Sequence, residues 1–138
     1  TMSLSLFACL AVIDLLSRLF WLERSLWTCN TGAFWGLALP PMLLYTLLAG
    51  LLGYIAWLFG KAEGEKRLWL GLVLMGGTVN ALDRLFHGCV LDYFAWPFGL
   101  SVFLPNFNLA DMILLLGVLG WFTSSWRWKA SSVIDKMK

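Results

Sequence analysis

The chain has 138 residues, of which 60% are hydrophobic, 16% are aromatic and only 13% are charged. Because about a quarter of the residues in an ordinary soluble domain are charged, this composition indicates a protein embedded in lipid. The formal net charge of +2 is too small to support binding to nucleic acid, and we expect no nucleic-acid partner.

Four apolar segments are predicted to cross the membrane. A helix needs roughly 20 mainly apolar residues to span a bilayer. The segments are about 4–22, 39–60, 68–86 and 108–126. Cys9 ends a run that resembles a lipoprotein cleavage box, but the apolar stretch before it is too short for a signal peptide, and we assign it to the first helix. The sequence therefore predicts an all-α membrane protein, with a single membrane-embedded domain over residues 1–138.

The segments between the predicted helices differ in character. Residues 61–67 read KAEGEKR and are predicted to form a tight polar hairpin. The two longer segments, 23–38 and 87–107, are rich in Trp, Tyr and Phe, which are typical of the membrane–water interface. We therefore predict two structured segments outside the cytoplasm.

The distribution of Lys and Arg predicts the orientation, because cytoplasmic loops carry an excess of basic residues. The side that holds 61–67 and the C-terminus carries seven of them, and the other side carries three. Both termini are therefore predicted to be cytoplasmic, and the two aromatic segments are predicted to face outward. The seven are Lys61, Lys66, Arg67, Arg127, Lys129, Lys136 and Lys138; the three are Arg18, Arg24 and Arg84.

The polar residues of the predicted helices gather towards the outer ends. Ionisable groups inside a membrane are costly and are candidates for function. A transporter or proton channel would need polar groups along its whole path, whereas the inner halves of these helices have no ionisable residue. The sequence therefore favours a site that opens outward. Its candidates are Asp14, Arg18, Asn80, Asp83, Arg84, Asp92, Asn108 and Asp111.

Two of the four aspartates stand apart from the others. Asp14 and Asp83 each have an arginine nearby in the sequence, which favours structural ion pairs with Arg18 and Arg84. Asp92 and Asp111 have no such neighbour. If they met in a low-dielectric cleft, they would share one proton, as in aspartic proteases. One carboxylate could then activate a water while the other protonates the leaving amine. The spacing leaves open whether they meet.

Other chemistries have weaker support. His87 is the only histidine, so a histidine-rich metal site is excluded. A metal site of Asp83, His87 and Cys89 is a weaker alternative to a plain interfacial histidine, and we expect no metal and no cofactor. Cys29 and Cys89 are both predicted to face outward. They could form a disulfide, but the sequence favours buried free thiols.

Three motifs resemble those of the lipoprotein signal peptidases, or signal peptidase II. Asn80-Ala81-Leu82-Asp83-Arg84 and Val90-Leu91-Asp92-Tyr93 resemble the Asn-x-x-Asp-Arg and Val-x-Asp-Phe motifs of that family. Phe107-Asn108-Leu109-Ala110-Asp111 resembles its Phe-Asn-x-Ala-Asp motif. Upstream, Asp14 with Arg18 is similar to the family's Asp and Lys on the first helix, and Asn30-Thr31-Gly32 is similar to its Asn-x-Gly loop.

The resemblance implies an aspartic endopeptidase of the bacterial cytoplasmic (inner) membrane, with its site facing outward. It would remove signal peptides from prolipoproteins that carry a diacylglyceryl group on the cysteine after the scissile bond. The expected partners are this substrate, membrane lipid and globomycin-type inhibitors. The alternative is a non-catalytic membrane protein that binds lipidated peptides. The implied catalytic residues are Asp92 and Asp111, and the implied supporting or substrate-binding residues are Asp14, Arg18, Asn30, Gly32, Asn80, Asp83, Arg84 and Asn108.

Three positions depart from the family pattern. Arg18 stands where Lys is usual, Tyr93 stands where Phe is usual, and Phe34 stands where a small residue is expected. The departures at Arg18 and Phe34 concern substrate contacts more than catalysis.

Overall fold

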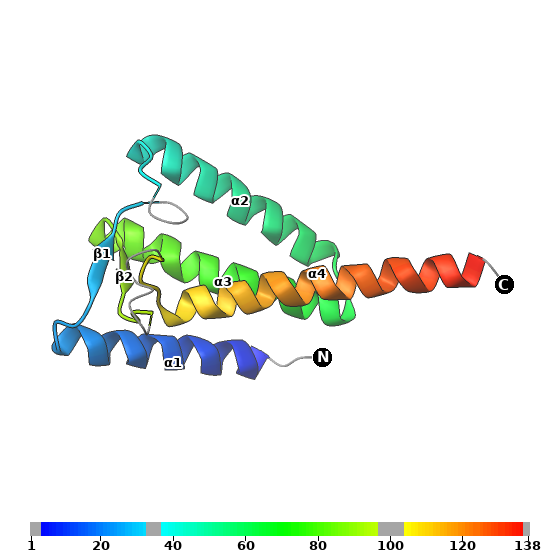
Figure 1. The fold of residues 1–138 in the computed structure, drawn as a ribbon, viewed down its shortest axis with the longest axis horizontal. Coiled ribbons are helices and arrows are strands. Elements are labelled where there is room, and N and C mark those ends of the chain that lie inside the picture. Colours follow the sequence, from blue (N-terminus) through cyan, green and yellow to red (C-terminus); the bar gives the residue numbers. More distant parts are fainter. Residues whose placement is uncertain (1–3, 33–36, 97–103, 137–138) are drawn as a thin grey trace.

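The computed structural model describes residues 4–32, 37–96 and 104–136, with side chains described from 5 to 126 within these ranges. The described part is mostly helical, as predicted. Helices α1, α3 and α4 run along the long axis of the molecule, and the two short strands lie at one end, while the start of α1 and the end of α4 lie away from them (Figure 1). The elements are α1 (Leu4–Glu23), β1 (Thr28–Asn30), α2 (Pro41–Lys61), α3 (Gly64–His87), β2 (Val90–Asp92) and α4 (Leu109–Lys136).

Three of the described helices contain stretches long and apolar enough to cross a membrane, namely Ser5–Glu23, Pro41–Lys61 and Leu109–Trp126. Large apolar side chains on these helices point outward, among them Leu16, Leu47 and Leu116. In lipid this exposure carries no hydrophobic penalty, so it supports a membrane location. Helix α3 is less apolar because it carries buried polar side chains in its C-terminal half, and its role as a fourth span stays a prediction.

Helices α3 and α4 pack with their backbones in contact. A Cβ atom added at Gly76 would collide with the carbonyl oxygen of Ala110, and one at Gly117 would lie 2.7 Å from the backbone nitrogen of Val73. Helices in lipid associate by such close packing because no hydrophobic force drives them together. Gly76 and Gly117 therefore permit the close approach of the two helices. The contact sets α4 directly against the face of α3 that carries Asn80.

Two boundaries differ from the prediction. Helix α3 begins at Gly64, whose φ of 55° permits the turn, so only Ala62 and Glu63 separate α2 from α3. The predicted 61–67 hairpin is therefore mostly helical. Helix α4 continues to Lys136 instead of ending near 126. Residues 127–136 contain neither Gly nor Pro, so nothing local ends the helix, although the apolar stretch that predicted it does end.

The two segments that were predicted to face outward contribute the strands of a small β ribbon, which the sequence did not predict. Strands β1 and β2 are antiparallel, with Thr28 opposite Asp92, Cys29 opposite Leu91 and Asn30 opposite Val90. Helix α3 ends at His87, and the C-cap residue Gly88, with a left-handed φ of 76°, turns the chain into β2.

The chain then folds back on itself before α4. Phe94 and Phe107 form an isolated antiparallel bridge, with Phe107 N donating to Phe94 O at 3.0 Å and Phe94 N donating to Phe107 O at 2.8 Å. This bridge brings the residues just before α4 next to the strand that carries Asp92. The first turn of α4 is thereby placed beside the end of β2.

Candidate active site

The first turn of α4 is built by a reciprocal capping box. The side-chain Oδ1 of Asn108 accepts a hydrogen bond from Asp111 N at 2.9 Å, and Asp111 Oδ2 accepts one from Asn108 N at 3.0 Å. Such a box satisfies backbone donors that a helix start would otherwise leave unpaired. It also fixes the Asp111 carboxylate, whose other oxygen accepts from Asn80 Nδ2 at 2.6 Å.

Asp92, at the end of β2, is held in a similar way. It is 2% exposed. Its Oδ1 accepts from Asn108 Nδ2 at 2.9 Å, and its Oδ2 accepts from Asn30 Nδ2 at 3.0 Å. Both carboxylates therefore accept two N–H groups each, and all four donors are neutral amides.

Asn108 joins the two carboxylates. It is completely buried, at 0% exposure. One side-chain amide hydrogen serves Asp92 and the other serves Asn80 Oδ1 at 3.1 Å, while its backbone N–H and Oδ1 engage Asp111. The structure thus brings together the two aspartates whose meeting the spacing left open. We call Asp92 and Asp111 the dyad.

The environment of Asp92 favours its protonated form. The pKa of Asp92 is raised to about 6, mainly by burial and also by the negative charge of Asp111, although the donors Asn30 and Asn108 and the charge of Arg84 lower it. Desolvation disfavours the ionised form of a carboxyl, and a second carboxylate nearby does the same. A carboxyl that keeps its proton to about pH 6 suits a pair that shares one proton.

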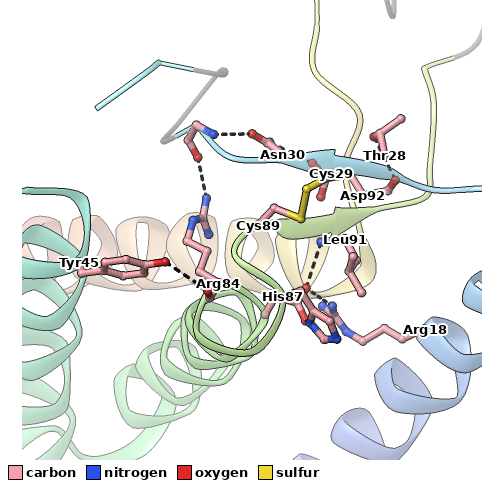
Figure 2. Close-up of a disulfide and its surroundings, with 12 residues drawn as sticks. Arg18, Thr28, Cys29, Asn30, Tyr45, Arg84, His87, Cys89, Leu91 and Asp92 are labelled. Carbon is pink, nitrogen blue, oxygen red and sulfur yellow. Dashed lines mark hydrogen bonds and ion pairs between the residues drawn. A yellow bond between two sulfur atoms is a disulfide. The ribbon is translucent and has the colours of Figure 1, made fainter. Parts of the chain in front are cut away.

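A separate ion-pair network of Asp14, Arg18 and Asp83 lies next to the strand that carries Asp92. Arg18 Nε donates to Asp14 Oδ2 at 2.6 Å, and its Nη1 donates to Asp83 Oδ2. That same Asp83 oxygen accepts from Leu91 N at 3.1 Å. The network therefore ties α1 to α3 and to β2, next to Asp92, as the sticks in Figure 2 show for Arg18 and Leu91.

The predicted partner was right for Asp14 and wrong for Asp83. Asp14 and Arg18 are four residues apart on α1 and share a face. Asp83 and Arg84 are neighbours on a helix and point in directions about 100° apart. Arg84 Nη2 instead donates to Gly32 O at 2.7 Å, and its Nη1 donates to Asn80 O at 3.2 Å.

Arg84 holds the loop that orients Asn30. Gly32 N donates to Asn30 Oδ1 at 3.1 Å, so the Asn30 amide nitrogen is directed at Asp92. Arg84 is in turn anchored through its carbonyl oxygen, which accepts from Tyr45 Oη at 3.1 Å. Figure 2 shows this chain of contacts from Tyr45 to Asn30. Arg84 thus acts on Asp92 indirectly, through Gly32 and Asn30.

Tyr93 departs from the family pattern, and its structural role was not predicted from the sequence. Its hydroxyl accepts a hydrogen bond from Leu109 N at 3.1 Å, and its ring stacks on Trp21 with 6.0 Å between centroids. Burial raises the pKa of Tyr93, so the phenol stays neutral. The hydroxyl links the residue after Asp92 to the first turn of α4. The signal in the sequence was the replacement of Phe by a residue that can hydrogen-bond.

The expectation of free thiols at Cys29 and Cys89 is wrong. The two form a disulfide, with 5.4 Å between their Cα atoms, a separation that disulfides require. The strand pairing brings them together, and that pairing was not visible in the sequence. His87 is half-exposed, and its Nδ1 lies 3.9 Å from Asp83 Oδ1. Phe34 lies outside the described residues.

Comparison with known proteins gives concordant matches. The family described as "Signal peptidase (SPase) II" matches residues 6–127. The lipoprotein signal peptidase of Xanthomonas euvesicatoria pv. vesicatoria (strain 85-10) is 37% identical over 101 residues, which cover 67% of this chain and 58% of that protein. The lipoprotein signal peptidase of Xylella fastidiosa (strain M12) is 36% identical over 73 residues, 53% of this chain and 43% of that protein. The chain thus spans less than two-thirds of the length of these relatives.

Two solved structures, both described as bacterial membrane enzymes, share the fold. The first is 19% identical with a TM-score of 0.75, and the matched region covers 91% of this chain and 87% of the chain in that structure. The second has a TM-score of 0.63 and 18% identity and covers 86% of this chain and 88% of its own. At this identity the likeness concerns the fold alone.

The Arg18 network gives a stability prediction. Arg18→Met removes the cationic partner of two buried carboxylates, and breaking a buried pair costs about 3–5 kcal/mol. We expect that loss in the free energy of unfolding in detergent, with a smaller loss for Arg18→Lys, which keeps the charge but not the forked geometry. Arg24→Met is the matched control, because Arg24 is exposed on the same helix. Equal stability of Arg18→Met and Arg24→Met would contradict the network's role.

Proposed function

Because the chain belongs to the signal peptidase II family, we propose that it is an aspartic endopeptidase that removes signal peptides from diacylglyceryl-modified prolipoproteins. The observation that carries this proposal is the dyad, with Asp92 and Asp111 both bonded to the buried Asn108. The alternative of a non-catalytic protein that binds lipidated peptides finds no support, since both carboxylates are retained and brought together.

In the proposed reaction the dyad holds one proton. The ionised carboxylate takes a proton from a water, whose oxygen attacks the carbonyl carbon of the scissile bond. The protonated partner then gives its proton to the leaving amine of the lipidated cysteine. Asp111 is the more accessible partner, being only half-buried, so substrate and water would approach from its side.

The amides around the dyad suit this proton exchange. Asn30, Asn80 and Asn108 orient the carboxylate oxygens without adding net charge. A lysine or arginine bonded directly to the pair would favour two ionised carboxylates and remove the acid. The remaining polar residues of the family pattern act as positioning residues in this proposal: Asp14, Arg18 and Asp83 through the ion-pair network, and Gly32 and Arg84 through the loop at Asn30.

We further propose an inner-membrane location, with α3 as the fourth span, cytoplasmic termini and an outward-facing dyad. Both strands, with Asp92 at the end of β2, and the first turn of α4 lie towards one end of the molecule, away from the start of α1 and the end of α4 (Figure 1). Of the three basic residues at that end, Arg18 and Arg84 are buried, so only Arg24 opposes the basic residues of the other side. A disulfide at the dyad end also fits an oxidising compartment. The lipid tails of the substrate would stay in the outer leaflet.

Cysteine labelling tests the orientation. In a Cys9→Ser background, a membrane-impermeant thiol reagent added to intact cells should label Leu26→Cys and leave Glu63→Cys unlabelled until the cells are opened. Leu26 is exposed at the dyad end, and Glu63 is exposed in the short connection at the other end. The reverse pattern would put the dyad on the wrong face for prolipoproteins.

The dyad predicts a matched set of inactive variants. Asn keeps the shape of Asp but cannot exchange a proton, so Asp92→Asn and Asp111→Asn should each nearly abolish cleavage of a diacylated prolipoprotein peptide by the purified protein. Their double variant should be little worse, because residues that act as a unit lose their effects together. Glu63→Gln, an exposed carboxylate far from the dyad, should cleave normally. More than about a tenth of wild-type turnover in either Asn variant, a loss of under roughly 1.4 kcal/mol, would refute the assignment.

The pKa of Asp92 predicts a pH effect with a definite sign. The pKa of Asp92 is raised to about 6, mainly by burial, and the hydrogen bond from Asn30 acts in the opposite direction and lowers it. Removing this donor in Asn30→Ala should raise the pKa and move the limb of the pH–rate profile set by Asp92 to higher pH. The apparent values belong to the coupled pair, so the measured quantity is the displacement of the limb. A limb that stays in place, or moves to lower pH, would contradict the contact.

A further inference from the structure

The disulfide lies next to the two strands that carry Asp92 and its donor Asn30. Cys29 directly precedes Asn30 on β1, and Cys89 directly precedes β2, which ends at Asp92. Figure 2 shows the sulfur–sulfur bond lying between the ribbons of β1 and β2, with Asn30 and Asp92 close beside it. The bond therefore joins the chain segment that supplies a donor to the segment that supplies the acceptor.

The two strands differ in how firmly the rest of the protein holds them. All three residues of β2 are buried, whereas Thr28 and Cys29 of β1 are exposed and Asn30 is only partly buried. Isolated two-stranded ribbons are marginal in water, and β1 buries little apolar surface that could fix it. Two contacts of Thr28 assist, one to Asp92 O and one from Asn106 Nδ2, each at 3.2 Å. Both are exposed or only partly buried.

From this asymmetry we propose that the Cys29–Cys89 disulfide is a positioning clamp, which holds Asn30 against Asp92 and makes full activity depend on the oxidised state. The functional half of this inference rests on the proposed cleavage. Cys29 and Cys89 touch no reacting atom; they act through the Asn30–Asp92 hydrogen bond of 3.0 Å. The register that the bond enforces places Asn30 opposite Val90, two residues before Asp92.

A dithiol, present in the cell envelope or added in vitro, can reduce the disulfide and so open the clamp. Cys29 is exposed and Cys89 is 2% exposed, so an attacking thiolate meets the sulfur of Cys29. A bond forms between the attacking sulfur and Cys29, and Cys89 leaves as a thiolate and takes a proton. The second thiol of the dithiol then displaces Cys29. The dithiol becomes a cyclic disulfide, and its two electrons and two protons pass to the two cysteines.

Closing the clamp is the reverse exchange. The two cysteine thiols give two electrons and two protons to a disulfide-bearing oxidant, which is reduced to a dithiol. Such oxidants belong to compartments outside the cytoplasm. The enzyme would therefore reach full activity only after its dyad end has been exposed to that compartment.

The test begins with the bond itself, in a Cys9→Ser background that removes the exposed third thiol of α1. The full chain, purified in detergent without reductant, is denatured and alkylated, and its mass is measured. We expect no adduct before treatment with dithiothreitol and two adducts after it. Two adducts before treatment would show that the clamp does not form, and would overturn the inference.

The second measurement is hydrogen exchange, which needs no substrate. Reduction should speed the exchange of amides in 28–30 and 90–92 by about tenfold or more, while amides around Gly76 in the α3–α4 contact keep their rates. Unchanged exchange in the two strands would overturn the clamp. Because this readout is independent of catalysis, failure of the oxidised wild type to cleave any prolipoprotein peptide would refute the proposed function and leave the clamp to be judged on exchange alone.

The third measurement separates positioning from mere stabilisation. Reduction should lower kcat/KM by about tenfold and move the pH–rate limb of Asp92 upward, as in Asn30→Ala. The groups that act on Asp92 from α3 and α4, Arg84 and Asp111, are unaltered by reduction. Cys29→Ala/Cys89→Ala should match the reduced protein and ignore dithiothreitol. In Asn30→Ala, reduction should have little further effect, because the clamp acts through that residue. If reduction lowers only the melting temperature and leaves rate and pH profile unchanged, the disulfide is a stabiliser and the inference is wrong.

Discussion

The arrangement of the dyad depends on one neutral residue, Asn108, which is hydrogen-bonded to both aspartates. Asn108 is fully buried, and it contacts Asp92 with its amide nitrogen and Asp111 with its backbone and amide oxygen. An amide is suited to this position because it donates and accepts without carrying charge. An aspartate there would add a third carboxylate to a buried site. A lysine would hold the carboxylates ionised and offer no acceptor to Asp111 N.

The four aspartates at the dyad end fall into two pairs that differ in their hydrogen-bond partners. Asp14 and Asp83 share Arg18, a charged partner whose pairing is structural. Asp92 and Asp111 meet amides only, and burial raises the pKa of Asp92 to about 6. The two pairs of aspartates therefore lie in different electrostatic environments. The arginine nearest the dyad, Arg84, directs its guanidinium hydrogen bonds to the carbonyls of Gly32 and Asn80.

The sequence predicts what local spacing can reveal. Hydropathy located the helices, the spacing of four between Asp14 and Arg18 identified their ion pair, and the grouping of polar residues identified the end that holds the dyad. Contacts between different helices and strands could not be predicted from the sequence. Asp83 pairs with Arg18, 65 residues away, and not with its neighbour. The β ribbon rests on three-residue strands, too short for an alternating pattern to be recognised. The disulfide was missed for the same reason, since it follows from the strand register.

The short strand β2 explains why so many different bonds converge around one aspartate. A side chain on a long helix is oriented by the helix, as the capping box orients Asp111 at the start of α4. Asp92 ends a three-residue strand, which cannot fix its own direction. The neighbouring residues are therefore fixed individually: Leu91 N donates to Asp83, Tyr93 accepts from Leu109 N, and Cys89 is bonded to Cys29.

Two residues that depart from the family pattern, Tyr93 and Arg18, make hydrogen bonds near this strand. The Tyr93 hydroxyl supplies an acceptor that phenylalanine lacks. Arg18 reaches two carboxylates on separate helices with two nitrogens of one fork, which a single ammonium cannot reproduce in geometry. Both departures add hydrogen bonds next to β2 and leave the dyad's own contacts unaltered. They are therefore best understood as changes in how the strand of Asp92 is held, with the chemistry of the dyad kept the same.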